Sequence, residues 1–263
     1  IVIFESTVHP GATEEICAPE LDKNSQNLKC GKDFFLGYSP ERVNPGDKIH
    51  TIDKINKVIS GQNKFVENIM FSIYSKLTKG KVFIAKSIKV AEASKVIENS
   101  QRDINIAFIN EITKICLKLN ISIYDVLEAS RTKWNFLDFK PGLVGGHCIG
   151  VDPYYLSEKA LSLKIKPDVI LSGRKTNDEM PKFISKEIEK KIKKGSKILF
   201  LGVTFKEDVP DMRNSKAIDL MSLLKKNHYL SFHDPYVEKL NGFKSIDFKK
   251  FDGKYDIIIL CVP

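Results

Sequence analysis

The feature of this sequence that most constrains the fold is a long segment, Ser87 to Leu119, that contains neither proline nor glycine. Its apolar residues recur at the three- and four-residue spacing of a helix. They are Ile97, Ile104, Phe108, Ile112, Ile115 and Leu119. A helix of this length is unusual inside one globular domain, so we expect it to join two folded units and to offer a face to a partner subunit. A further helix is expected from Ser122 to Ser130.

Short continuous apolar runs lie on both sides of this segment, and such runs are typical of parallel strands that are covered on both faces. The runs are Ile1–Phe4, Phe34–Tyr38, Lys81–Ala85, Lys197–Leu201 and Asp256–Val262. Helical segments at Lys64–Leu77 and Ala217–Lys226 lie between them. This alternation predicts an α/β fold with parallel sheets. Because the first and last runs stand at the ends of the chain, we expect both α/β units to be incomplete.

The composition excludes several classes of protein. With 42% hydrophobic and 29% charged residues, the chain is globular, and no apolar run reaches the roughly 20 residues that span a bilayer. The net charge of +9 comes from lysines spread along the chain, as at Lys186–Lys194, so we expect no nucleic-acid partner. The 5 cysteines show no paired spacing, which favours a reducing, cytoplasmic compartment over a disulfide framework.

A glycine-rich loop, Pro141 to Gly150, carries the residue with the most obvious chemistry, Cys148. Glycines let a backbone approach a ligand closely and adopt positive φ. The loop runs into Asp152-Pro153, a pair typical of a helix start, where backbone N–H groups could stabilise a thiolate. A free cysteine is also commonly a small buried side chain. The local sequence therefore leaves Cys148 either as a nucleophile or as a structural residue.

Two other chemistries fit this loop less well. His147 and Cys148 are adjacent, and no second cysteine or histidine pair follows at the spacing of a zinc site, so we expect no metal. A thiol hydrolase is the other possibility. It would need a base from elsewhere in the chain, because a histidine next to the cysteine in sequence is badly placed to take its proton.

A second group of polar residues lies on the long helical segment. Lys95 and Asn99 are four residues apart, so they project from one face, which Arg102 continues. A cation and a neutral donor that face a cleft would stabilise an oxyanion. An asparagine in such a segment is also commonly a surface residue or a satisfied buried amide. The pair therefore indicates a site only in combination with other residues.

Polar residues also follow the expected strands. Glu5-Ser6-Thr7 follows the first strand and Ser39-Pro40-Glu41-Arg42 follows the second. In open parallel sheets, ligands bind beyond the carboxyl ends of the strands. Serine and threonine at such turns also cap the next helix, and we expect capping for Ser6 and either role for Thr7. Gly202, after Lys197–Leu201, stands alone without the Gly-x-Gly-x-x-Gly pattern of a dinucleotide site.

Taken as a set, five ordered segments resemble the UDP-glucose/GDP-mannose dehydrogenase family of nucleotide-sugar 6-dehydrogenases. They cover essentially the whole chain, at spacing similar to that of the family. The segments are Glu5–Gly11, Tyr38–Gly46, Lys95–Ile106, Phe139–Tyr155 and Gly202–Ser215.

The resemblance implies an α/β architecture of two Rossmann-like parallel-sheet domains, both truncated, joined by a helical middle domain. Residues 1–86 would be the C-terminal part of an NAD-binding domain, 87–185 a helical dimerisation domain with the cysteine loop, and 186–263 part of a UDP-binding domain. It also implies a homodimer through the long helix. The family's glycine-rich NAD fingerprint is expected before Ile1, so we expect a fragment that is inactive on its own.

The chemistry implied by the resemblance is a four-electron oxidation of a sugar C6 hydroxymethyl group to a carboxylate by two NAD molecules in turn. Cys148 matches the family nucleophile, which traps the aldehyde as a thiohemiacetal and then holds the acid as a thioester until water releases it. Covalent capture keeps a reactive aldehyde from escaping between the two oxidations.

The other site residues follow from the same resemblance. Lys95 matches the lysine that stabilises the oxyanion, Asn99 its hydrogen-bonding companion, and Asp152 the carboxylate that orders Lys95 and water. Thr7 and Glu41 match residues that position water and act as acid or base. Contacts with NAD are implied for Ser6, Thr7 and Arg213. Contacts with substrate are implied for Glu41, Arg42, Val43, Asn44, Lys95, Asn99, Arg131, Phe139, Lys140, Gly142, Gly145, Phe205 and Lys206, with Arg131 reaching into the partner's site.

The sequence around Cys148 looks most similar to the branch of the family that acts on UDP-N-acetylhexosamines for surface polysaccharides, and UDP-glucose enzymes have a serine in place of His147. We therefore expect UDP-GlcNAc or UDP-GalNAc as substrate. The alternatives are a UDP-ManNAc or UDP-glucose 6-dehydrogenase, a thiol hydrolase, or a non-catalytic dimerisation or nucleotide-binding module. Such a module would be expected to lack Cys148, Lys95 or Asp152, yet all are present.

Overall fold

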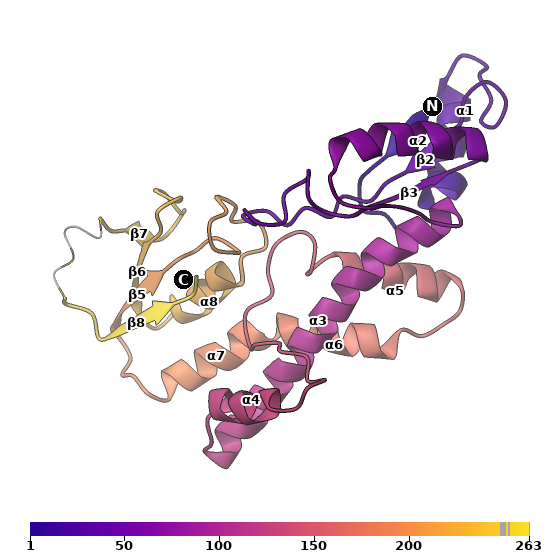
Figure 1. Ribbon diagram of the computed structural model, residues 1–263. Coiled ribbons are helices and arrows are strands. Elements are labelled where there is room, and N and C mark those ends of the chain that lie inside the picture. The colour runs from indigo at the N-terminus through magenta and orange to yellow at the C-terminus, as the bar shows by residue number, and fades with distance from the viewer. Residues whose placement is uncertain (248–250, 252, 263) are drawn as a thin grey trace. The chain divides into compact units, whose positions relative to one another are not determined.

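The computed structural model describes residues 1–247, 251 and 253–262 (Figure 1). The chain divides into two compact units. The first consists of Ile1–Ser100 and Asp152–Pro167, and the second consists of Gln101–Val151 and Asp168–Pro263. The long helix α3 (Ile88–Leu119, 32 residues) contributes its beginning to the first unit and its remainder to the second.

The first unit contains a four-stranded sheet in the order β1-β2-β3-β4. The strands are β1 (Val2–Phe4), β2 (Leu36–Tyr38), β3 (Lys57–Gly61) and β4 (Val82–Ile84). The pairs β1–β2 and β3–β4 are parallel, as expected, whereas β2–β3 is antiparallel. Strand β3 was not expected from the sequence because its apolar run is only Val58-Ile59, flanked by a lysine and a serine.

The helices of this unit are the π-helix η1 (Thr13–Cys17), α1 (Ala18–Asn24), α2 (Lys64–Leu77), the start of α3, and α5 (Asp152–Ser162). Apolar side chains of α1, α2 and α3 pack against the sheet. Helix α2 begins where the Asn63 side chain accepts a hydrogen bond from the Val66 N–H. Its buried residues Val66, Met70 and Tyr74 pack with Ile59 of β3, so the predicted segment Lys64–Leu77 is confirmed as a helix.

The second unit contains a parallel sheet in the order β7-β6-β5-β8. The strands are β5 (Lys197–Leu201), β6 (Tyr229–His233), β7 (Lys244–Ser245) and β8 (Ile257–Leu260). In chain order this is 3-2-1-4, the start of a doubly wound sheet. Ile198 and Phe200 of β5 pack with Leu220, Met221 and Leu224 of α8 (Lys216–Leu224), and none of these side chains is more than 1% exposed.

The remainder of the second unit is helical. It contains most of α3 together with α4 (Ile123–Arg131), α6 (Asp168–Asp178) and α7 (Met180–Glu189). Helix α4 is capped by Ser122, whose side chain accepts a hydrogen bond from the Asp125 N–H. The expected helices at Ser87–Leu119 and Ser122–Ser130 are confirmed within one residue at each end. In the part of the chain that the structure describes, no helix combines the length and apolar character needed to cross a membrane.

Candidate functional site

In the first unit, the residues that follow β1 and β2 lie side by side. The parallel pairing continues past the strands, because the Ser39 N–H donates to the Phe4 carbonyl at 3.0 Å and the Glu41 N–H donates to the Glu5 carbonyl at 3.2 Å. The fully buried Tyr38 donates its hydroxyl to the Ser6 carbonyl at 3.1 Å. The predicted edge with Glu5–Thr7 and Ser39–Glu41 is therefore a fixed feature of this unit.

The turn after Thr7 is held by a residue that the sequence did not single out. Glu92 of α3 is fully buried, and its carboxylate accepts hydrogen bonds from the N–H groups of Gly11 at 2.5 Å and Thr13 at 2.8 Å. The expectation that Ser6 caps the next helix is wrong, because that helix begins at Thr13, seven residues later in the chain. Glu92 of α3 instead binds backbone N–H groups on either side of the start of that helix.

Lys95 and Asn99, which were predicted to stabilise the oxyanion, lie in the first unit together with Asp152, which was predicted to order Lys95 and water. Lys95 is 8% exposed and Asp152 is 3% exposed. The Asn99 side-chain amide donates to the Asp152 carboxylate at 2.5 Å, and Asp152 opens α5, as its sequence predicted. Burial raises the pKa of Asp152, while the Asn99 hydrogen bond and the Lys95 charge act in the opposite direction. The result is a buried carboxylate with a neutral donor bound to it and a cation nearby.

The segment after β2 is tied to the same part of α3. Glu41 accepts hydrogen bonds through one carboxylate oxygen from the N–H groups of Arg42 at 2.7 Å and Val43 at 2.6 Å. The Arg42 guanidinium forms an ion pair with Glu98 at 2.9 Å and donates to the Asn56 carbonyl at 3.0 Å. Glu98 immediately precedes Asn99, so Arg42 connects the strand end to the buried cluster.

A second buried cation, Lys57, lies beside Glu5, the residue that follows β1. Lys57 is only 2% exposed, its ammonium lies 3.7 Å from the Glu5 carboxylate, and it stands 5.2 Å from the centre of the Tyr74 ring. The Tyr74 hydroxyl donates to the same Glu5 oxygen at 2.6 Å, and burial followed by this bond raises the pKa of Tyr74. Sequence reasoning missed Lys57 because lysine is seldom buried.

In the second unit, Cys148 is exposed at the end of a loop without regular structure. A side chain at Gly145 would meet the Asn214 carbonyl at 2.6 Å, and one at Gly146 would meet the Phe205 ring at 2.7 Å. Gly146 also has φ +81°, and its carbonyl accepts a hydrogen bond from the Asn214 side chain at 3.3 Å. The glycines are therefore required by the close approach of the loop that follows β5.

We expect Gly146→Ala to disrupt the cysteine loop, because the new methyl group combines positive φ with a clash against Phe205. The loop amides should lose protection in hydrogen exchange, and turnover by the full-length protein should fall by about 10-fold or more. Gly150→Ala is the matched control, because its nearest contact is an ordinary 3.4 Å to the Gly146 carbonyl and it has no positive φ. Equal protection in both variants would show that the loop tolerates the methyl group.

Three other predicted residues of the second unit, Arg213, Arg131 and Phe139, have local partners. Arg213 forms a two-point ion pair with Asp211, with distances of 2.6 and 3.0 Å, and this lowers the pKa of Asp211 to about 2, with a further contribution from His147. Arg131 pairs with Asp138 at 2.7 Å. Phe139 packs on the apolar cluster of α3 and α4, which anchors the start of the loop.

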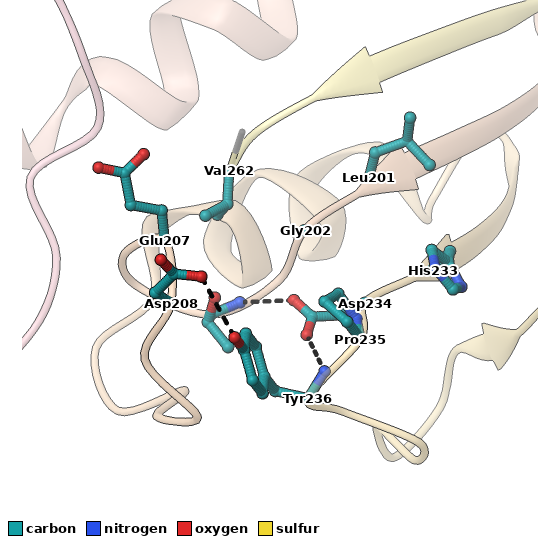
Figure 2. A pocket seen from close by; sticks show the side chains of 10 residues that line it. Leu201, Gly202, Glu207, Asp208, His233, Asp234, Pro235, Tyr236 and Val262 are labelled. Atoms are coloured by element: carbon teal, nitrogen blue, oxygen red, sulfur yellow. Dashed lines mark hydrogen bonds between the residues drawn. The ribbon is translucent and has the colours of Figure 1, made fainter. Parts of the chain in front are cut away.

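A cavity of about 300 Å³ opens at the carboxyl ends of β5, β6 and β8 (Figure 2). Asp234 lies at its floor and accepts hydrogen bonds from the N–H groups of Val203 at 2.7 Å and Thr204 at 3.3 Å. These are N–H groups of the kind that bind phosphate in dinucleotide folds. Glu207 and Asp208 add further negative charge to the lining. In this structure Asp234 occupies the N–H groups of Val203 and Thr204, and the cavity lining contains no predicted site residue.

The predicted site residues thus form two groups. Lys95, Asn99 and Asp152 are gathered in the first unit with the strand ends that carry Thr7 and Glu41, whereas the second unit contains Cys148 with Phe205 at the base of its loop. The first group can stabilise a developing oxyanion and order a water molecule. The second group contains the exposed thiol of Cys148, on a loop whose glycines allow it to pack closely against Phe205 and Asn214.

Comparison with known proteins identifies three domains of one family. Models of the UDP-glucose/GDP-mannose dehydrogenase family match residues 1–109 (NAD binding domain), 89–179 (central domain) and 199–263 (UDP binding domain). The chain is 51% identical to the protein CapL of Staphylococcus aureus and 47% identical to a UDP-N-acetyl-D-glucosamine 6-dehydrogenase of Pseudomonas aeruginosa. Both alignments cover 100% of this chain and 64% of the relative.

Among solved structures, a UDP-D-ManNAc dehydrogenase from Pyrococcus horikoshii superposes with a TM-score of 0.85 at 30% identity. It covers 100% of this chain, which in turn covers 62% of that protein. The chain therefore spans less than two thirds of the length of these relatives. The α/β fold expected from the sequence is confirmed, and the description of the first domain supports NAD as the cofactor.

Proposed function

This chain belongs to the UDP-glucose/GDP-mannose dehydrogenase family, and we propose that its full-length protein oxidises the C6 hydroxymethyl group of a UDP-N-acetylhexosamine to a carboxylate. The observation that carries the proposal is the buried cluster of Lys95, Asn99 and Asp152, which is suited to a reaction that develops charge on oxygen. We further propose that residues 1–86, 87–185 and 186–263 are the NAD-binding, central and UDP-binding parts.

The edge of the first sheet fits a dinucleotide, because Ser6 and Thr7 follow a parallel strand where such cofactors bind. In this proposal Ser6, Thr7 and Arg213 would hold NAD, which would supply the hydride acceptor for each oxidation. The first oxidation converts the alcohol to an aldehyde, and the hydroxyl proton passes to a base at the site. Placing the carbonyl oxygen beside Lys95 and Asn99 stabilises the negative charge that appears there.

Cys148 then attacks the aldehyde carbon and forms a thiohemiacetal, so that the aldehyde stays bound. Loss of the second hydride and of the hydroxyl proton gives a thioester between Cys148 and the sugar acid. Water adds to the thioester carbon, and the C–S bond breaks to return the thiolate and release the carboxylate. Thr7 and Glu41 position and deprotonate this water, and Asp152 keeps the Lys95 ammonium oriented toward the oxyanion.

The proposed substrate contacts include charged and polar side chains, which are suited to phosphates and hydroxyls, and the glycines Gly142 and Gly145, whose backbone lets a sugar approach closely. In addition to Lys95 and Asn99, these residues are Glu41, Arg42, Val43, Asn44, Arg131, Phe139, Lys140, Gly142, Gly145, Phe205 and Lys206. The preference for an N-acetylhexosamine is supported by the 47% identity to the UDP-N-acetyl-D-glucosamine 6-dehydrogenase of Pseudomonas aeruginosa.

The test is to give the full-length protein UDP-GlcNAc, UDP-GalNAc, UDP-ManNAc and UDP-glucose separately with NAD, and to follow NADH by absorbance. We expect two NADH per sugar consumed, with UDP-GlcNAc or UDP-GalNAc giving the highest kcat/KM. One NADH per sugar would contradict the four-electron reaction. No NADH with any sugar would refute the proposed function.

We also propose that the protein is a homodimer formed through α3. In the second unit, Phe108, Ile115 and Leu119 are 59%, 47% and 63% exposed. Their spacing of seven and four residues puts them on one face of the helix. An exposed apolar stripe on a long helix is suited to the same stripe of a second copy, because a twofold axis brings identical faces together.

Replacing Phe108 with aspartate should therefore weaken dimerisation by about 100-fold or more, because a charge would be buried where an aromatic anchor had packed. Light scattering after gel filtration at micromolar concentration should then give the mass of one chain. Ile49→Asp is the control, since Ile49 is 71% exposed but lies in a loop of the first unit. A dimer of unchanged stability in the Phe108 variant would exclude this face as the interface.

A further inference from the structure

A buried polar network in the second unit connects α3 and α6 to the loop that carries Cys148. Its side chains are Asp103 and Asn110 of α3 and Arg174 and Asn177 of α6, and none is more than 2% exposed. The Arg174 guanidinium binds the Asp103 carboxylate at 2.6 Å, and the Asn177 amide donates to the same oxygen at 2.7 Å. Burying charged and polar side chains costs free energy unless they are paired. The pairing of these four side chains therefore indicates that their positions are fixed relative to one another.

Asn110 is the member of this network that contacts the loop. Its side-chain nitrogen donates to the Gly142 carbonyl at 2.9 Å, and its side-chain oxygen accepts from the Gly142 N–H, also at 2.9 Å. One amide thus satisfies both backbone polar groups of a single loop residue, as a neighbouring strand would. The same nitrogen donates to the Asn177 side-chain oxygen at 2.8 Å, so three hydrogen bonds hold the Asn110 amide in one orientation.

The orientation of Asn110 is set by the rest of the network. Because the Asn177 nitrogen donates to Asp103, its oxygen faces Asn110 and requires a donor there. The Asn110 nitrogen therefore faces Asn177, and its oxygen is left for the Gly142 N–H. The buried ion pair of Asp103 with Arg174 in this way determines which loop groups Asn110 can bind.

The loop needs such anchors because no helix or strand holds it between Phe139 and Gly150. Asn110 anchors it at Gly142, and Asn214 anchors it at Gly146 through the hydrogen bond to its carbonyl. Cys148 follows the second anchor by two residues. We propose that Asn110 is a positioning residue for the reaction, which holds the loop backbone at Gly142 and thereby the place of the Cys148 thiol. This inference rests on the proposed function.

The test compares full-length Asn110→Leu with the wild-type protein and with Asn105→Ala. Leucine has the same branched shape and the same number of side-chain heavy atoms as asparagine, although it is larger, and it makes none of the three hydrogen bonds. Asn105 is on the same helix, and its amide donates within that helix, to the Gln101 carbonyl. Hydrogen exchange is measured on the peptide that contains residues 139–148, and kcat and the KM for NAD are measured by NADH absorbance.

We expect the leucine variant to exchange the 139–148 peptide at least 10-fold faster and to lose about 10- to 100-fold in kcat, with the KM for NAD within twofold of wild type. The alanine control should match wild type in all three. Unchanged exchange, or faster exchange with kcat within threefold of wild type, overturns the inference. A wild-type protein that makes no NADH would instead refute the proposed function, and exchange alone would then decide whether Asn110 holds the loop.

Alkylation of Cys116 separates loop movement from unfolding, since this thiol is 4% exposed in the same helix. It should stay unreactive toward iodoacetamide in the leucine variant. If it reacts, Asn110→Ser is used in its place, because serine removes the paired bonds to Gly142 without adding an apolar surface. The same criteria of exchange rate and kcat then apply to the serine variant.

Discussion

Cys148→Ser should reduce formation of the sugar acid by about 10³-fold or more. A serine hydroxyl is far less ionised than a thiol near neutral pH, and this loop has no histidine placed to act as its base. An oxygen ester is also a poorer acyl carrier than a thioester, so release of the acid would slow as well. The loss should appear in kcat at saturating UDP-sugar and NAD, measured by NADH absorbance.

The matched control is Cys17→Ser. Cys17 is also a free cysteine, but it lies in η1 of the first unit, and burial raises the pKa of its thiol. Its replacement should leave kcat within about twofold of wild type. Substitutions that are not fully buried and lie away from the proposed catalytic residues usually have small effects on stability and geometry. Wild-type turnover in Cys148→Ser would remove this thiol from the mechanism.

Lys95→Met should lower kcat by about 10²- to 10³-fold, the loss typical of removing one oxyanion donor. Methionine keeps most of the length and apolar character of the lysine stem, so the packing of a residue only 8% exposed is largely preserved. The charge that faces Asp152 is lost, and the reacting oxygen would have only the neutral Asn99 as a donor. The affinity for NAD, measured by fluorescence titration, should stay within about threefold.

Lys89→Met provides the comparison for Lys95. Lys89 lies on the same helix two turns earlier, is exposed, and forms an ion pair with Glu15 at 2.9 Å. It should leave kcat unchanged, because an exposed ion pair contributes little to the structure. If Lys89→Met and Lys95→Met lowered kcat equally, turnover would depend on the total charge of α3 and not on the position of Lys95.

The sequence predicted the elements whose signals are local. The apolar spacing from Ser87 to Leu119 identified α3, and the continuous runs at Lys81–Ala85 and Lys197–Leu201 identified β4 and β5. Asp152-Pro153 marked the start of α5. In each case the residues that determine the element lie within it, so periodicity and capping chemistry were sufficient.

The residues that the sequence did not reveal act across the chain. Glu92 binds the N–H group of Gly11, which lies about 80 positions earlier in the chain. Lys57 forms an ion pair with Glu5, and Asn110 binds the backbone of Gly142. Nothing in the neighbouring residues distinguishes these side chains from ordinary helix or strand positions. Their roles depend on tertiary contacts, which a single sequence does not specify.

If Cys148 carries the sugar acid as a thioester, Glu41→Gln should allow this species to be observed. Glutamine cannot deprotonate the water that releases the acid, so the thioester should accumulate. Full-length Glu41→Gln is mixed with UDP-GlcNAc and NAD, quenched with acid, digested and analysed by mass spectrometry. We predict that the peptide containing Cys148 carries the mass of the UDP-linked uronyl group and loses it on treatment with hydroxylamine. An unmodified Cys148 peptide, in a sample that has already formed two NADH per enzyme, would show that Cys148 does not carry the acid.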